Sequence, residues 1–198
     1  LAFFYKSMET KDKLLEEIQS TDAIQRYLSG DIPLHGEKLF KPILWIPILF
    51  EYNARNWLSF GSRSSMELNQ PYLYITIKSI LQRCNDSFHI CIIDDASFAK
   101  LLPEWNISMH KVSAPISTNL RFLGWIKLLY KYGGMICPPS FLCMQDLFQL
   151  YERGIQGNKF FLTEMVNRNI TSTSYLLYPN IEFCGAPKEC PVVQKLCD

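Results

Sequence analysis

A long, almost wholly apolar helix pattern that ends in two glycines constrains this chain more than any other feature. Between Leu120 and Tyr132 the only charged residues are Arg121, Lys127 and Lys131. A helix that is apolar around nearly its whole circumference has to be buried, between a sheet and other helices. We therefore predict an interior helix over Leu120–Tyr132, which Thr118 or Asn119 caps with a side-chain oxygen.

The residues that follow predict a stop, a short strand and a second stop. Gly133-Gly134 ends the helix, because glycine adopts the left-handed conformation after a helix C-terminus without a steric penalty. Met135 to Cys137 is short and apolar, as buried strands are, and Pro138-Pro139 ends it by removing two N–H donors. The unit thus delivers Pro138, Pro139 and Ser140 to the end of a core strand.

The run Leu129-Tyr130-Lys131-Tyr132-Gly133-Gly134-Met135 resembles the LYxYGG signature of DXD-region glycosyltransferases, the capsular-polysaccharide and mannosyltransferase-like group. The resemblance covers residues 41–198 and implies an α/β, GT-A-like (Rossmann-like) fold, with a central mixed sheet flanked by helices. In that family the strand after the glycines ends in Asp-x-Asp, which holds a divalent metal on the donor diphosphate. The same positions here are Pro138, Pro139 and Ser140, so both carboxylates are missing. The family's Ser-Asp-x-x-Arg pattern falls on Arg121, Phe122 and Trp125, where its polar groups are also lost.

These replacements bear directly on the chemistry. Sugar transfer builds charge on the leaving diphosphate, and a cation held by carboxylates usually compensates it. Mg²⁺ and Mn²⁺ prefer hard oxygen ligands; proline side chains offer none, and Ser140 offers only an uncharged hydroxyl. We therefore expect no catalytic residue, metal or cofactor, and interpret the domain as a non-catalytic structural or interaction protein on a degenerate scaffold.

The alternative is an active, metal-independent hexosyltransferase that uses a nucleotide-sugar donor. Its donor contacts would be Trp45, Arg63, Asp94, Asp95 and Arg121, with Arg63, Arg121 or Arg168 supplying the charge of the missing metal. In the resembled family a Trp at the end of the first strand, here expected over Ile43–Ile46, lies near the donor. The acids follow a predicted strand over Phe88–Ile93, at the edge where open α/β sheets place ligand contacts. Acids at a strand end more often cap the next helix, here predicted over Ser97–Leu102, and we favour that interpretation.

A second resemblance concerns the run from Pro138 to Cys143. A YGG strand followed by Pro-x-Ser-Phe-Leu-Cys is similar to uncharacterised proteins of large DNA viruses. It implies a virion component such as a minor capsid protein, located in the virion or the infected-cell cytoplasm. Its partners would then be capsid or scaffold proteins.

Composition limits the classes of protein and site to which this chain can belong. The 198 residues are 48% hydrophobic and 20% charged, as in a globular domain, and the net charge of +1 gives no electrostatic case for nucleic acid binding. The spacing of three histidines and seven cysteines suggests no zinc site. One disulfide among Cys184, Cys190 and Cys197 stays open, although a reducing compartment disfavours it.

The rest of the chain divides into a lead-in and a domain. Residues 1–40 are expected to be a helical lead-in, and the apolar run Leu1–Tyr5 is either the end of a membrane anchor or a tail that docks on the domain. Residues 41–198 form the domain, which we expect to continue beyond Asp198. Further expected elements are a helix over Gln70–Cys84, a connecting strand and loop over His110–Ser117, a helix over Met144–Arg153, strands over Lys159–Met165, Tyr175–Tyr178 and Ile181–Cys184, and a helix from Cys190.

Overall fold

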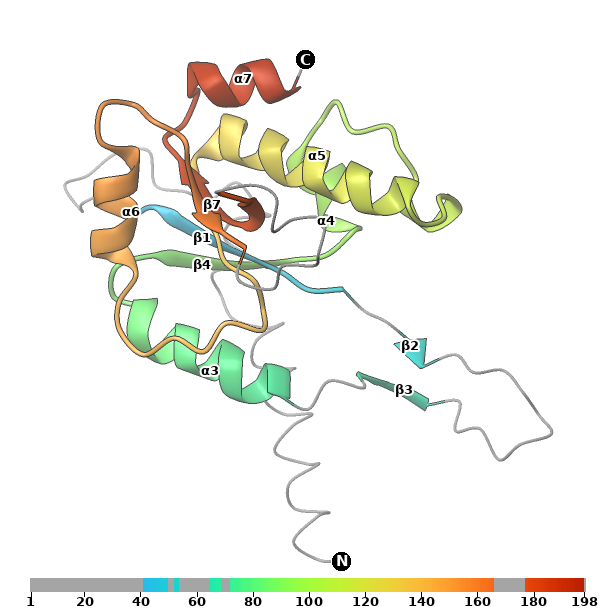
Figure 1. Cartoon of the computed structure of the whole chain (residues 1–198). Helices are drawn as coiled ribbons and strands as arrows, with labels where there is room; N and C mark the ends of the chain where they lie inside the picture. The colour runs from blue at the N-terminus through green and yellow to red at the C-terminus, as the bar shows by residue number, and fades with distance from the viewer. Residues whose placement is uncertain (1–40, 50–51, 54–64, 69–71, 166–176, 198) are drawn as a thin grey trace, which may run out of the picture.

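The structure is a computed structural model that describes residues 41–49, 52–53, 65–68, 72–165 and 177–197 (Figure 1). The expected lead-in over 1–40, Arg63 and Arg168 lie outside these residues. The elements in chain order are β1 (Ile43–Pro47), β2 (Tyr52–Asn53), β3 (Ser65–Leu68), α3 (Tyr72–Cys84), β4 (His89–Ile93), α4 (Ser97–Leu101), the 3₁₀ turn η1 (Met109–Lys111), α5 (Ile116–Tyr132), β5 (Gly134–Ile136), α6 (Phe148–Ile155), β6 (Phe161–Glu164), β7 (Pro179–Ala186) and α7 (Pro191–Cys197).

Five strands form one mixed sheet in the order β4-β1-β5-β7-β6. β1 runs parallel to β4 and to β5, whereas β7 runs antiparallel to both β5 and β6. The predicted α/β class with a central mixed sheet is therefore confirmed. β2 and β3 form a separate antiparallel pair.

Helices cover both faces of the sheet. Successive side chains of β1 point to opposite faces, so the sheet divides the hydrophobic core into two halves. Ile43 and Trp45 pack on the side of α4, α5 and α7, while Leu44 and Ile46 pack on the side of α3 and α6 (Figure 1). All five residues of β1 are buried, as expected of a central strand with helices on both faces.

Helix α5 confirms the buried helix, its end at the glycines and the short strand after it. Gly133 has φ +72° and its N–H donates to the carbonyl of Leu129 at 2.8 Å. The expected start was wrong, because α5 begins at Ile116 and neither Thr118 nor Asn119 caps it. Instead the carbonyl of Pro115 accepts from the N–H groups of Thr118 (3.1 Å) and Asn119 (3.4 Å), so the helix gains a first turn of its own.

Pro47 also corrects a prediction, because β1 continues through it rather than ending at Ile46. The carbonyl of Trp45 accepts from Cys137 on the β5 side, whereas the N–H of Ile48 donates to Ile93 on the β4 side. Residue 47 shares the side of residue 45 and so faces β5. The pairing of β1 with β5 ends at Trp45 and Ile136, so the N–H that proline lacks is not part of that ladder.

The remaining expected elements agree with the structure to different degrees. The strand expected within His110–Ser117 is wrong, since η1 and a turn occupy this region. Helix α6 begins at Phe148 rather than Met144, because the Asp146 carboxylate accepts from the Phe148 N–H at 3.0 Å. The strand expected over Ile181–Cys184 lies within β7. Of the strand expected over Tyr175–Tyr178, Leu177 and Tyr178 have no strand structure, and residues 175–176 lie outside the described residues. The final helix α7 confirms the helix predicted from Cys190.

Two further expectations concern the chain as a whole. All seven cysteines are thiols, so the disulfide left open among Cys184, Cys190 and Cys197 is not formed. In the part of the chain that the structure describes, none of the helices combines the length and the apolar character needed to cross a bilayer.

Candidate functional site

A hollow of about 470 Å³ opens at the carboxyl ends of β1 and β4. We call it the strand-end hollow. Its walls come from the residues after β1, the residues after β4, the segment Ile107–His110 and Arg121 of α5. The carboxyl edge of parallel strands is where open α/β sheets bind ligands, so this hollow is the candidate site. Asp94, Asp95 and Arg121, three of the predicted donor contacts, all line it.

Asp94 forms hydrogen bonds with Ser97, the residue at which α4 begins. Its Oδ1 accepts from the Ser97 N–H at 2.9 Å and from the Ser97 hydroxyl at 2.6 Å, and its own N–H donates to the Ser97 Oγ at 3.0 Å. This reciprocal pairing satisfies a backbone donor that the helix itself leaves unpaired. The favoured interpretation, in which the acid caps the next helix, is confirmed for Asp94.

Asp95 and Arg121 bind one another through two parallel hydrogen bonds. Nε of Arg121 lies 2.8 Å from Oδ1 of Asp95, and Nη2 lies 2.8 Å from Oδ2. The two side chains are only 34% and 23% exposed, and this fork geometry is the strongest that a guanidinium and a carboxylate adopt. Two carboxylates against one guanidinium give Asp94, Asp95 and Arg121 a formal charge of −1, so this group does not offer a diphosphate net positive charge.

Trp45 does not reach the strand-end hollow, and the expectation that it contacts a donor is corrected. The side chain is 0% exposed, its Nε1 donates to the carbonyl of Gly133 at 3.0 Å, and its ring centroid lies 5.9 Å from that of Tyr132. The reason is the length of β1: the strand continues to Pro47, so Trp45 lies in its middle, beneath α5, rather than at its end.

The segment Pro138–Ser140 folds against α3 instead of lining the hollow. The Thr76 hydroxyl donates to the carbonyl of Pro139 at 2.6 Å, and the Phe141 N–H donates to the carbonyl of Pro138 at 3.0 Å. The two prolines are half-buried and Ser140 is exposed. These residues supply no carboxylate to a cation, and among the described residues no three His, Cys, Asp or Glu side chains are grouped to hold a metal. The donor set therefore does not fit the divalent metal that the resemblance implies.

The apolar replacements on α5 are part of the core. Trp125 is 6% exposed, and its ring centroid lies 5.3 Å from that of the half-buried Phe122. Both side chains belong to the cluster that joins α4, α5 and the sheet. Two of the three positions on which the resembled family's pattern falls, Phe122 and Trp125, are thus filled with packed rings, and the third is Arg121.

Sequence reasoning missed several residues of the hollow. Ile107, Ser108 and His110 line it from the segment between α4 and α5, and Leu49 lines it from the residues after β1. No local pattern distinguishes these residues, because only the tertiary fold brings the two segments together. The role of Ser97 did have a signal, since Asp94 and Ser97 have the Asp-x-x-Ser spacing of a helix start.

Comparison with protein-family models, curated proteins and solved structures finds no match to this chain.

Proposed function

We propose that this chain is a non-catalytic structural or interaction protein on a degenerate GT-A-like glycosyltransferase scaffold. The observation that carries the proposal is the closed pair of Asp95 and Arg121, with both guanidinium-to-carboxylate bonds at 2.8 Å. A donor diphosphate would have to displace Asp95 to gain the charge of Arg121. The parallel order β4-β1-β5, with β7 antiparallel beside it, supports the GT-A-like scaffold.

The energetics favour loss of catalysis. Removing a preorganised electrostatic contact from a transfer reaction costs about 3–4 kcal/mol of barrier, and metal charge contributes several kcal/mol. Pro138, Pro139 and Ser140 provide no replacement, and the one cation at the strand-end hollow is already neutralised among the described residues. A catalyst built on this edge would lack both sources of charge stabilisation.

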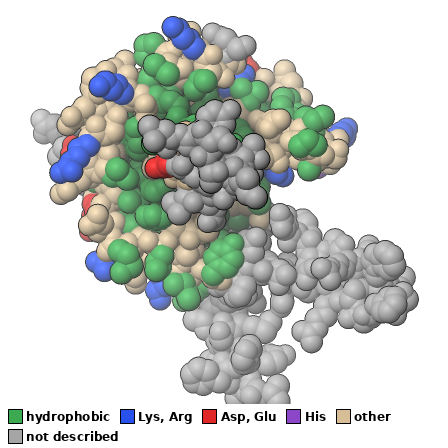
Figure 2. All heavy atoms as spheres, viewed as in Figure 1, with side chains coloured by type: hydrophobic (Ala, Val, Ile, Leu, Met, Phe, Trp, Pro, Cys, Tyr) green, Lys and Arg blue, Asp and Glu red, His purple; other side chains and the backbone are tan. Residues whose placement is uncertain are grey.

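An interaction role agrees with the exposed apolar side chains. Tyr72 and Ile75 of α3 are 46% and 62% exposed, and Leu142 and Met144 are 51% and 72% exposed on the segment that hydrogen-bonds to α3. Figure 2 shows hydrophobic side chains reaching the surface between polar ones on one face of the molecule. Contiguous exposed apolar patches mark protein interaction sites, and we propose that these side chains belong to one.

The run from Pro138 to Cys143 supports a more specific proposal, a virion component of a large DNA virus such as a minor capsid protein. Its partners would be other capsid or scaffold proteins. Mass spectrometry of purified particles tests this: we expect the chain at a fixed stoichiometry with the capsid proteins. Detection in infected cells but not in purified particles would contradict it.

The strand-end hollow itself favours the second candidate, a metal-independent glycosyltransferase. Its volume of about 470 Å³ lies in the usual range of small-molecule sites. An assay of nucleoside diphosphate release from a panel of nucleotide-sugars separates the two functions. Our proposal predicts no release above buffer, with or without Mn²⁺. Metal-independent release that Arg121→Ala abolishes would establish the enzyme instead.

A further inference from the structure

Two buried thiols face one another where the end of α3 meets the segment after β5. Cys84 is the last residue of α3, and Cys143 lies 59 positions further along the chain. Their Sγ atoms are 3.7 Å apart, and the two residues are 0% and 3% exposed. A disulfide bond is about 2.05 Å long, so the two sulfur atoms need to come only about 1.7 Å closer to form one.

Hydrogen bonds hold the segment around Cys143 against α3 before any bond forms between the thiols. The N–H of Cys143 donates to the Ser79 Oγ at 2.8 Å, within the last two turns of the helix that ends at Cys84. The Ser87 hydroxyl donates to the Asp146 carboxylate, three residues beyond Cys143. The segment is thus tied to the helix and to the turn that follows it, so closing the bond orders little more of the chain.

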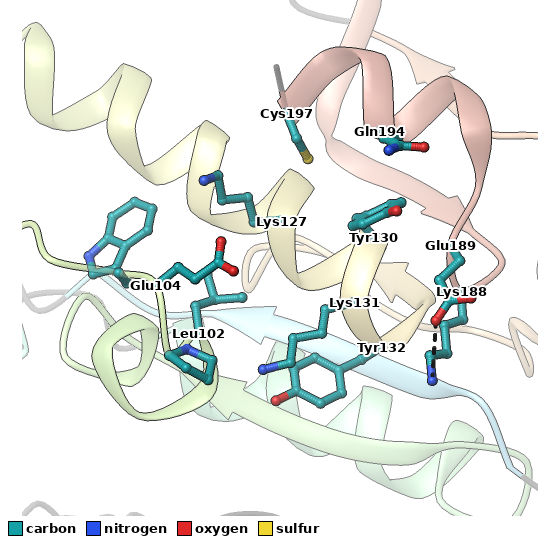
Figure 3. A pocket seen from close by; sticks show the side chains of 12 residues that line it. Leu102, Glu104, Lys127, Tyr130, Lys131, Tyr132, Lys188, Glu189, Gln194 and Cys197 are labelled. Atoms are coloured by element: carbon teal, nitrogen blue, oxygen red, sulfur yellow. Dashed lines mark ion pairs between the residues drawn. The ribbon is translucent and has the colours of Figure 1, made fainter.

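Other thiols of the chain have different surroundings. The sulfur atoms of Cys184 and Cys190 donate to backbone carbonyls, those of Ile181 at 3.2 Å and Asn158 at 3.5 Å. The half-buried Cys197 extends from α7 toward α5, into a hollow of about 670 Å³ between the two helices (Figure 3). Among the described residues that line this hollow, Cys197 is the one cysteine. The contact between Cys84 and Cys143 is therefore a feature of their position rather than of every thiol here.

A small oxidant reaches the pair through the segment that carries Cys143. Leu142 and Met144, on either side of it, are 51% and 72% exposed, and residues 137–147 have no helix or strand structure. Local opening of such a segment requires less free energy than global unfolding. Burial raises the pKa of both thiols, that of Cys84 to about 12, so thiolates are scarce at neutral pH and thiol–disulfide exchange is slow.

We propose that Cys84 and Cys143 are a dithiol site that a small-molecule disulfide of the glutathione type oxidises to an intramolecular disulfide. The Cys143 thiol loses its proton, and the thiolate attacks one sulfur of the oxidant, forms a mixed disulfide and expels one thiolate. Cys84 then loses its proton, attacks the Cys143 sulfur and expels the second thiolate. The expelled thiolates take up the two protons, so the protein pair is oxidised by two electrons and the oxidant is reduced to two thiols.

The bond fixes the segment with Leu142 and Met144 to α3, which carries Tyr72 and Ile75. These four side chains are the exposed apolar groups of the proposed interaction role, so oxidation makes that surface more rigid. This consequence rests on the proposed function, whereas formation of the bond does not.

The test is incubation of the intact, folded chain with glutathione disulfide and glutathione at mildly alkaline pH, quenching with N-ethylmaleimide, and tryptic mapping by mass spectrometry. Trypsin releases Cys84 on residues 84–100 and Cys143 on residues 132–153, and fragmentation of the linked peptides assigns the bond. We expect the linked peptides to become the dominant species within hours and dithiothreitol to reverse the link. The oxidised chain should melt roughly 5–15 °C higher, because the cross-link restricts the unfolded chain over about 60 residues.

Cys143→Ala and Cys137→Ala are the matched variants, because each removes a buried thiol after β5 and only the first removes a member of the pair. Cys143→Ala should abolish both the link and the rise in melting temperature, whereas Cys137→Ala should retain both. Far-UV circular dichroism shows whether each variant is folded, and the map of the wild-type chain decides the proposal even where a variant is not.

Four results would each overturn the proposal: a link from Cys84 to another cysteine, a mixed disulfide that never resolves, oxidation only in urea, or a fall in melting temperature on oxidation. Its failure is separable from that of the proposed function, which nucleotide-sugar turnover and the composition of purified particles test.

Discussion

Replacing Trp45 by phenylalanine tests whether this residue is a core element, as the structure places it, or a ligand contact. The indole is fully buried and donates to the carbonyl of Gly133 at 3.0 Å, at the junction of α5 and β5. Phenylalanine removes the donor and leaves a buried carbonyl unpaired, which costs about 1–3 kcal/mol. The smaller ring also leaves a cavity, so we expect the free energy of unfolding to fall by roughly 2–4 kcal/mol in total.

Trp105→Phe provides the matched control. Trp105 is 8% exposed, and its Nε1 is a buried polar atom with no hydrogen-bond partner in the described structure. The same substitution there loses ring volume but no hydrogen bond. Removing the unpaired N–H at position 105 also relieves a desolvation penalty, so Trp45→Phe should be the more destabilising variant by at least the contact to Gly133, about 1–3 kcal/mol or roughly 2–12 °C in melting temperature for a domain of this size.

Urea unfolding followed by far-UV circular dichroism measures both variants, because their signal does not depend on tryptophan fluorescence. Equal destabilisation by the two substitutions would refute the reasoning about the hydrogen bond. A neutral Trp45→Phe would refute the placement of Trp45 in the core.

Three other predictions follow from single positions. Gly134→Ala should abolish folding, because at φ +101° its Cβ would collide with the Ile43 carbonyl oxygen. Gly157→Ala, at φ +74° with only the Lys159 side chain within ordinary contact at 3.6 Å, should cost only about 1–2 kcal/mol. Soluble expression and thermal melts distinguish the two variants. Asp95→Asn should lower the free energy of unfolding by about 1 kcal/mol or less, since the ion pair with Arg121 is partly exposed, and a urea titration that shows a loss above 2 kcal/mol would contradict this. Burial raises the pKa of Cys91 to about 12, whereas the unfolded thiol ionises near 9, so its stabilising contribution is present below pH 9 and is lost as the pH rises toward 12. At pH 10 this loss is about 1.4 kcal/mol, and Cys91→Ala should show a shallower fall in urea midpoint from pH 8 to pH 10 than the wild type.

Local sequence patterns were enough to predict helix α5, its end at the glycines and strand β5. The apolar run of α5, its end at Gly133 and the short strand after it depend on residues that are neighbours in sequence, and each has a local physical cause. The cap formed by Asp94 and Ser97 is equally local, because three residues separate the two side chains.

The features that sequence reasoning missed depend on contacts between distant segments. Pro47 belongs to a central strand only because β5 ends early beside it, and this one extension moves Trp45 from a strand end into the core. The pair of Asp95 and Arg121 joins residues 26 positions apart, and the strand-end hollow joins the ends of two strands, the segment Ile107–His110 and α5. No pattern along the chain contains that information.

The most direct test of the account is a calorimetric titration of the intact chain with UDP and with GDP, each with and without Mn²⁺. Because Asp95 neutralises Arg121 and no carboxylate follows β5, we predict no heat beyond dilution up to millimolar nucleotide, and no effect of the metal. A dissociation constant in the micromolar range for either nucleotide would contradict the claim that the donor site has been lost.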